Sequence, residues 1–169
     1  MVEIVLLFVL LFCLITDIYN RKILNVVTIP AILFGLIYFT TESGLEGLWF
    51  SFSGFIFGLI LLLIPFMFGG MGAGDVKLMA AIGALMGSIF VLHAFFFTAI
   101  IGGCISLIIL LRRMGIKQVA THMFVTFFVF RGQTKEMYTS PEGKRNFSFP
   151  YGVAIVSGTL LAYIWGGYL

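Results

Sequence analysis

The apolar positions of this chain fall into long runs separated by short polar connections. Six runs are candidates for membrane spans, at about residues 2–16, 26–39, 48–68, 76–87, 89–111 and 151–166. A spanning helix uses about 20 residues, so the shorter runs must borrow residues from their flanks. The pattern predicts an all-α membrane protein, a bundle of about six transmembrane helices that forms a single domain over residues 1–169.

The apolar stretch from 76 to 111 is divided because of its length. At about 1.5 Å per residue it would make about 54 Å of helix, whereas the hydrocarbon core of a bilayer is about 30 Å thick. Two crossings fit this length, and Gly87-Ser88 is the natural break. The glycine-rich stretch 69–75 before it predicts a turn or an unwound segment at a membrane boundary.

The charges sort by side of the membrane. All ten basic residues fall in the first, third and fifth connections, if Lys77, the second residue of the fourth span, is counted with the third connection. The only charged residues of the N-terminus and the second connection are acidic. The positive-inside rule then makes the odd connections cytoplasmic and leaves both termini outside. The fifth connection, 112–150, is predicted to be a cytoplasmic loop, with an apolar segment at 123–130 that is too short to span and lies on the bilayer surface.

Composition supports a multi-pass protein of the inner (cytoplasmic) membrane and narrows its partners. Hydrophobic residues make up 61% of the chain and charged residues 10%, against about 45–50% and about 25% in soluble domains. The net charge of +3 is explained by the basic residues that orient the protein in the membrane. We therefore expect contacts with the lipid bilayer and none with nucleic acid. Cys13 and Cys104 lack the spacing of a disulfide framework or a metal site. We expect no metal and no organic cofactor.

Two acidic residues, Asp17 and Asp75, are predicted at the cytoplasmic ends of the first and fourth spans. Carboxyl groups near hydrocarbon are costly and typical of functional sites. Each has a purely structural alternative, because Asp75 could cap a helix and Asp17 could pair with Arg21. However, an acid at the C-terminal end of a helix opposes the helix dipole. Capping also leaves the alternating glycines before Asp75 unexplained.

The residues around both aspartates resemble a known family. Residues 72–83, which begin Gly72-Ala-Gly74-Asp75-Val-Lys77, look like the GxGD motif of the type IV prepilin peptidases, which are membrane aspartyl proteases. In that family's other catalytic segment an aspartate is followed by a basic residue, an asparagine and a threonine. The similar residues here are Asp17, Arg21, Asn25 and Thr28. Residues 150–154, Pro-Tyr-Gly-Val-Ala, resemble the start of the family's last span.

The resemblance implies an aspartic endopeptidase that removes the basic leader peptide of type IV prepilin-like precursors, which are pilins, pseudopilins or preflagellins. Cleavage would follow a glycine at the cytoplasmic face of the membrane. The chain has no counterpart of the cytoplasmic insertion with paired cysteines that bifunctional members carry, so no methyltransferase activity is expected. This short form looks most like the peptidases of Flp-type (tight adherence) pili or the archaeal preflagellin peptidases.

Peptide hydrolysis by Asp17 and Asp75 needs one carboxylate that takes a proton from water and one carboxylic acid that donates to the scissile carbonyl. Two like charges within a few Å cannot both ionise, so the pair would share one proton. Which aspartate is the acid stays open, because a coupled pair titrates jointly.

The residues beside the aspartates have supporting roles with alternatives. Gly72 and Gly74, like Gly70, are expected to let an extended substrate approach and to permit positive φ. Lys77 either steadies Asp75 or the oxyanion, or extends to the membrane interface. Asn25 and Thr28 either hydrogen-bond Asp17 or the substrate, or cap a helix. Arg21 is expected to contact anionic lipid headgroups.

Two other classes of function compete with a peptidase. In a proton-coupled transporter the aspartates would relay protons, although transporters usually place their acids at mid-bilayer and often contain inverted repeats. The sequence has no such repeat. In a non-catalytic subunit of a pilus or secretion machine, Asp17→Asn and Asp75→Asn would leave function intact.

Overall fold

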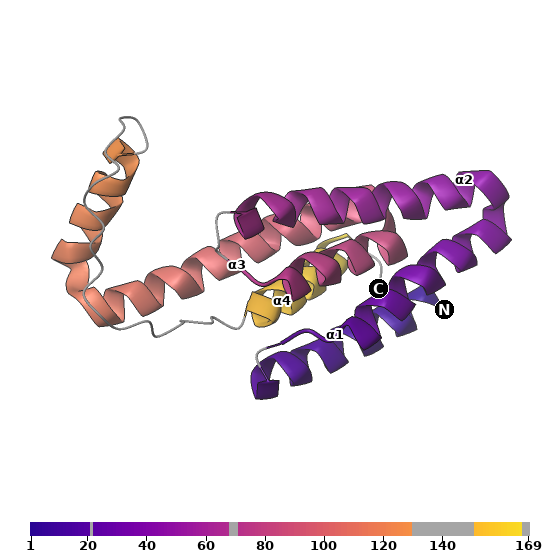
Figure 1. Cartoon of the computed structure of the whole chain (residues 1–169), viewed down its shortest axis with the longest axis horizontal. Coiled ribbons are helices and arrows are strands. Elements are labelled where there is room, and N and C mark those ends of the chain that lie inside the picture. Colours follow the sequence, from indigo (N-terminus) through magenta and orange to yellow (C-terminus); the bar gives the residue numbers. More distant parts are fainter. Residues whose placement is uncertain (21, 68–70, 130–150, 167–169) are drawn as a thin grey trace. The chain divides into compact units, whose positions relative to one another are not determined.

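The computed structural model of the chain describes residues 1–20, 22–67, 71–129 and 151–166, and the regular structure in these residues is helical. The helices are α1 (Val2–Asn20), α2 (Asn25–Met67), α3 (Ala73–Val129) and α4 (Tyr151–Trp165) (Figure 1). By length and composition α1, α2 and the Ala73–Ile109 part of α3 could each cross a membrane, and α4 is apolar but shorter. The prediction of an all-helical chain is confirmed for the described residues.

α2 consists of two helical limbs joined at Gly44. This residue has φ 61° and ψ −133°, a left-handed conformation that glycine adopts without the steric cost of a Cβ. The chain turns back on itself there, beside the α2 label in Figure 1. The rings of Phe39 and Phe50, one on each limb, have centroids 4.8 Å apart. The connection predicted at 40–47 is therefore a single non-helical residue inside otherwise helical chain.

α3 also contains a glycine of positive φ, Gly87 at 84°, where the sequence predicts a break between spans. The ends of the helices differ from the predicted ends of the apolar runs. α1 continues to Asn20, and α3 begins at Ala73 and continues to Val129. Residues 112–129 are therefore helical where the sequence predicts a loop, and the placement of 123–130 on the bilayer surface stays a prediction. Polarity marks where side chains leave hydrocarbon, whereas a helix continues as long as its backbone hydrogen bonds do. Residues 130–150 lie outside the described part.

The chain divides into two compact units. The first comprises Met1–Gly102 with Ser148–Leu169, and the second Gly103–Phe147. The second unit contains the C-terminal part of α3. The first unit contains α1, α2, α4 and the N-terminal part of α3, and all contacts described below lie within it.

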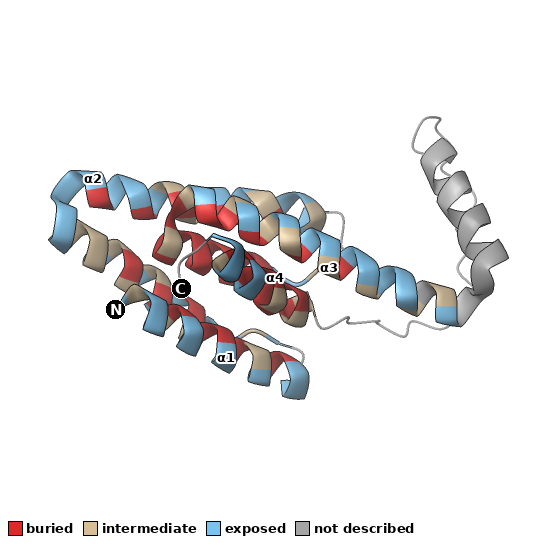
Figure 2. Cartoon of the chain, turned by 180° about the vertical axis from the view of Figure 1, so that it is seen from behind, coloured by how far each residue is buried: buried red, intermediate tan, exposed pale blue. Residues whose placement is uncertain are grey.

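The centre of the first unit is the N-terminal part of α3, where the buried residues concentrate (Figure 2). From 75 to 85, every residue except Lys77 is buried. Gly54 of α2 and Gly83 of α3 meet backbone to backbone, because a Cβ added at either would overlap the carbonyl oxygen of the other. Ser51 Oγ donates a hydrogen bond to the carbonyl of Ala84 at 2.7 Å. Small residues and buried hydroxyl groups of this kind hold helices together in lipid, where the hydrophobic effect does not.

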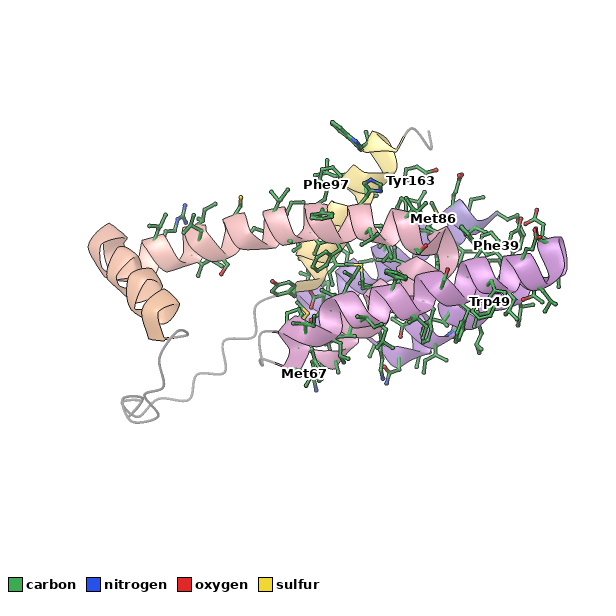
Figure 3. All side chains as sticks on the ribbon, turned by 90° about the horizontal axis from the view of Figure 1, so that it is seen from above. Phe39, Trp49, Met67, Met86, Phe97 and Tyr163 are labelled. Carbon is green, nitrogen blue, oxygen red and sulfur yellow. The ribbon has the colours of Figure 1, made fainter. Side chains whose placement is uncertain are left out.

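α1 packs against both α2 and α4. α4 also contacts α3, since a Cβ added at Gly158 would overlap Thr98. Large apolar side chains lie on the outer faces of the helices, and Trp49 and Met67 project outward in Figure 3. An apolar exterior around a closely packed interior suits a protein whose solvent is the bilayer.

Candidate active site

Four helix ends meet around the two aspartates. The start of α3 lies against the chain before α2, because a Cβ added at Gly74 would be 2.9 Å from Cβ of Ile23. The start of α4 lies against the end of α1, where a Cβ added at Gly152 would be 2.6 Å from Oδ2 of Asp17. The last turn of α1 and the N-terminal ends of α2, α3 and α4 therefore share one region. The first amides of a helix have no partner within it and can bind a carboxylate or an oxyanion.

Asp17 is in the last turn of α1 and is only 4% exposed. The backbone amides of Gly152 and Val153, in the first turn of α4, hydrogen-bond its carboxyl group. Its Oδ2 atom is buried and has no hydrogen-bond partner within the described part of the chain. A buried carboxyl oxygen without a partner is costly in a structural site, so this atom is a candidate for contact with water or substrate.

Asp75 is in the first turn of α3 and is 8% exposed. Its Oδ2 atom accepts a hydrogen bond of 3.0 Å from the amide of Gly72. In return, the amide of Asp75 donates to the carbonyl of Gly72 at 3.1 Å. The side chain of the third helical residue thus binds the amide of the N-cap residue, which is one half of a capping box, and a backbone hydrogen bond replaces the N-cap side chain that glycine lacks.

The capping alternative requires Asp75 to be the N-cap of α3. Gly72 occupies that position, so this alternative is wrong. Neither Gly72 nor Gly74 has a positive φ, so the freedom that the sequence predicts for them is not used in this structure. Gly74 instead allows close packing, since a side chain there would collide with Ile23. Gly70 lies outside the described residues.

The fold brings the two aspartates together from separate helices. Asp17 and Asp75 are close enough for their carboxyl groups to interact electrostatically. Both are buried, and charge interactions are stronger where water is excluded than at an exposed surface. A proton shared between two such carboxyl groups is what acid and base catalysis by an aspartate pair would require.

Two of the supporting residues bind each other. Lys77 Nζ donates a hydrogen bond of 3.0 Å to Oδ1 of Asn25, at an exposed position. This pair links the start of α2 to the start of α3. The sequence leaves Lys77 between a contact with Asp75 or the oxyanion and an extension to the membrane interface. It leaves Asn25 between a hydrogen bond to Asp17 or the substrate and a helix cap. The structure pairs the two supporting residues instead.

Thr28 and Arg21 are the remaining supporting residues, and only Thr28 lies in the described part of the chain. Thr28 is fully buried, and its Oγ1 has no hydrogen-bond partner in the residues that the structure describes. It does not cap α2, because the carbonyl of Leu24 accepts the amides of Val27 and Thr28. Arg21 lies outside the described residues, so its pairing with Asp17 or with lipid stays a prediction.

Gly152 and Val153 are contacts of Asp17 that residue-by-residue reasoning does not find. The sequence signal available for them is a glycine inside the first turn of an apolar helix. Glycine costs about 1 kcal/mol relative to alanine in a helix interior, so its presence there suggests a packing requirement. Nothing in the sequence says which side chain it must accommodate.

Comparison with known proteins decides the family. The sequence model of the type IV leader peptidase family matches residues 4–107, more than half of the 169 residues. The chain belongs to the type IV leader peptidase family. Comparison with curated proteins and with solved structures gave no match.

Membership in the type IV leader peptidase family makes this chain a peptidase and, together with its long apolar helices, a membrane protein. The resemblance seen in the sequence is confirmed. Asp17 and Asp75 both lie within the matched residues, whereas α4, which contacts Asp17, lies outside them.

Proposed function

We propose that this type IV leader peptidase is an aspartic endopeptidase whose catalytic pair is Asp17 and Asp75. The observation that carries the proposal is the meeting of two buried carboxyl groups from separate helices at a cluster of helix ends. No structural role requires two acids to be buried within electrostatic reach of each other, because like charges destabilise the fold unless they share a proton. Membership in a peptidase family supplies the reaction class.

In the proposed reaction the pair holds one proton. The ionised carboxylate takes a proton from a water molecule as the water oxygen attacks the scissile carbonyl carbon, and the protonated partner donates to the carbonyl oxygen. The resulting tetrahedral diol collapses and the C–N bond breaks. The leaving amine takes the proton from the protonated member of the pair, and one diol hydroxyl group returns its proton to the other carboxylate as the product carboxylic acid forms. Peptide and water thus become a carboxylic acid and an amine, and the dyad again holds one proton. The chemistry needs neither a metal nor a cofactor.

The proposed substrate is a type IV prepilin-like precursor, a pilin, pseudopilin or preflagellin whose basic leader is removed at the cytoplasmic face. Family membership supports this substrate class. The distribution of basic residues supports the cytoplasmic side, since all of them lie in the first, third and fifth predicted connections. In this topology α2 and α3 each cross twice, turning at Gly44 and Gly87, and both termini lie outside.

The start of α3 is the proposed place for the substrate backbone. The amide of Asp75 already donates to the carbonyl of Gly72, so the proposed donors are the other amides of this turn, to which an extended peptide would add as a strand adds to a sheet edge. Gly72 presents no side chain that would block this approach, whereas Gly74 is covered by Ile23 and allows the start of α3 to pack there. The pair of Lys77 and Asn25 braces the two helix starts beside it.

The test is cleavage of a co-expressed prepilin-like precursor by the wild type and by Asp17→Asn and Asp75→Asn. Each variant keeps the shape of the side chain and removes its acid–base function, so processing should fall at least about 100-fold. Glu46→Gln is the matched control, because Glu46 is an exposed acid in α2 far along the chain from both aspartates. It should process at the wild-type rate.

Wild-type processing by either aspartate variant would refute the dyad. If the folded wild type processed none of several precursors, a transporter or a non-catalytic assembly subunit would be the better interpretation.

A further inference from the structure

We infer that the first turn of α4 positions the carboxyl group of Asp17, and that Gly152 is a positioning residue of the peptidase reaction. The inference rests on the proposed function, because it assumes that Asp17 takes part in the chemistry. α4 lies outside the residues matched by the family, so its role is argued from contacts alone.

Gly152 is in direct contact with Asp17. A Cβ atom added at Gly152 would lie 2.6 Å from Oδ2, 2.8 Å from Cγ and 3.1 Å from Cβ of Asp17. All three of its nearest neighbours belong to that one side chain. A carbon atom needs about 3.5–4.0 Å from its non-bonded neighbours, so any residue larger than glycine would displace the carboxyl group.

The same turn supplies hydrogen-bond donors. The amides of Gly152 and Val153 bind the carboxyl group of Asp17, and amides in the first turn of a helix have no partner within it. The contact leaves Oδ2 buried and without a partner in the described residues. α4 therefore restrains the orientation of the carboxyl group, with its amides bound to the carboxyl group and Oδ2 packed against Gly152.

α4 can act as a fixed support because other contacts hold it. Gly158 packs so closely on Thr98 of α3 that an added Cβ would be 2.5 Å from the backbone nitrogen of Thr98. Near the far end of α4, the hydroxyl group of Tyr163 hydrogen-bonds the carboxylate of Glu3 at the start of α1. Because Glu3 and Asp17 lie near opposite ends of α1, α1 and α4 run antiparallel and are joined near both ends.

A purely structural role for Gly152 would affect folding alone, so the test separates catalysis from stability. Purified full-length wild type, Gly152→Ala and Gly35→Ala are compared for thermal unfolding in detergent and for kcat and KM on one precursor that the wild type cleaves. Gly35→Ala is the matched control for crowding, since its Cβ would also lie 2.6 Å from its nearest neighbour, the carbonyl oxygen of Ala84. The atoms nearest to a Cβ added at Gly35 belong to Ala84 and Leu85, and neither residue is part of the aspartate site.

Gly152→Ala should lower kcat about 10- to 100-fold, because small displacements of a catalytic group have effects of this size, with KM within about twofold of the wild type. Gly35→Ala should keep the wild-type kcat per folded molecule. Should Gly152→Ala fail to fold, Val153→Pro serves instead, because it removes one amide donor in the first helical turn, where proline is best tolerated. It should also lower kcat and leave KM unchanged.

Asp17→Asn is assayed beside these variants. Full activity of Asp17→Asn would overturn the proposed function itself. Loss of activity in Asp17→Asn together with wild-type kcat in folded Gly152→Ala or Val153→Pro would overturn only the role of α4.

Discussion

Asp17 and Asp75 are held in different ways. Asp75 binds the amide of Gly72, three residues before it, and stabilises the start of its own helix. Asp17 is held by Gly152 and Val153, which come from the last helix of the chain. One aspartate is therefore oriented by local sequence, and the other depends on the assembly of α1 with α4.

Because the two carboxyl groups are held by different contacts, different changes to the protein should displace them. The hydrogen bonds between Asp75 and Gly72 can form as soon as the first turn of α3 does, because all their atoms lie in four consecutive residues. The contact of Asp17 with α4 forms only when distant parts of the chain have packed. Disturbing the bundle should therefore affect the two carboxyl groups together, whereas disturbing one helix start should affect one of them.

The largest effect is expected from Gly83→Leu, which disrupts the packing of α2 on α3. The relative position of both aspartates depends on this packing. A side chain at this position overlaps the backbone of Gly54, and crowding of a packed core costs about 1–3 kcal/mol, or more where backbone must move. We expect a large fall in the thermal unfolding midpoint in detergent and loss of precursor cleavage. Gly103→Leu is the control, because nothing lies within 4 Å of a Cβ added there. A wild-type midpoint for Gly83→Leu would contradict the close crossing of α2 and α3.

An intermediate effect is expected from Gly72→Pro, which addresses Asp75 alone. Proline removes the amide that donates to Oδ2 of Asp75, and a hydrogen bond to a charged group is worth about 1.5–3 kcal/mol. We expect kcat for precursor cleavage to fall at least about tenfold and the unfolding midpoint to fall as well, because the same hydrogen bond stabilises the start of α3. Gly72→Ala keeps the amide, and its Cβ would lie 3.4 Å from Oδ2 of Asp75, so this variant should retain most of the activity. Equal losses in both variants would argue against a role for the amide.

The smallest effect is expected from Lys77→Met. The hydrogen bond between Lys77 and Asn25 is exposed, and exposed polar pairs contribute little to stability. Cleavage should change less than about twofold, and Asn25→Ala should behave alike. A loss as large as that of Gly72→Pro, measured in the same cleavage assay, would mean that Lys77 acts on the chemistry directly and not through Asn25.

Several features of the site could be predicted because they depend on residue type. Asp17 and Asp75 stand out from the sequence since few charges occur in so apolar a chain and both lie at the ends of apolar runs. Helix ends were predicted less well. Thr16 Oγ1 donates to the carbonyl of Cys13 within α1, so a polar residue can be satisfied inside a helix and need not end it.

The sequence by itself determined the helical class, the two candidate acids and the break at Gly87, and it placed the connection inside α2 at 40–47 without identifying Gly44 as the turning residue. Hydropathy, the cost of charge in lipid and the freedom of glycine are properties of single residues or short stretches, so they can be read along the chain. Only the tertiary structure decided that Gly152 contacts Asp17 and that Asn25 pairs with Lys77. Such contacts join residues far apart in the chain, and they depend on which helix faces pack together, which no local pattern specifies.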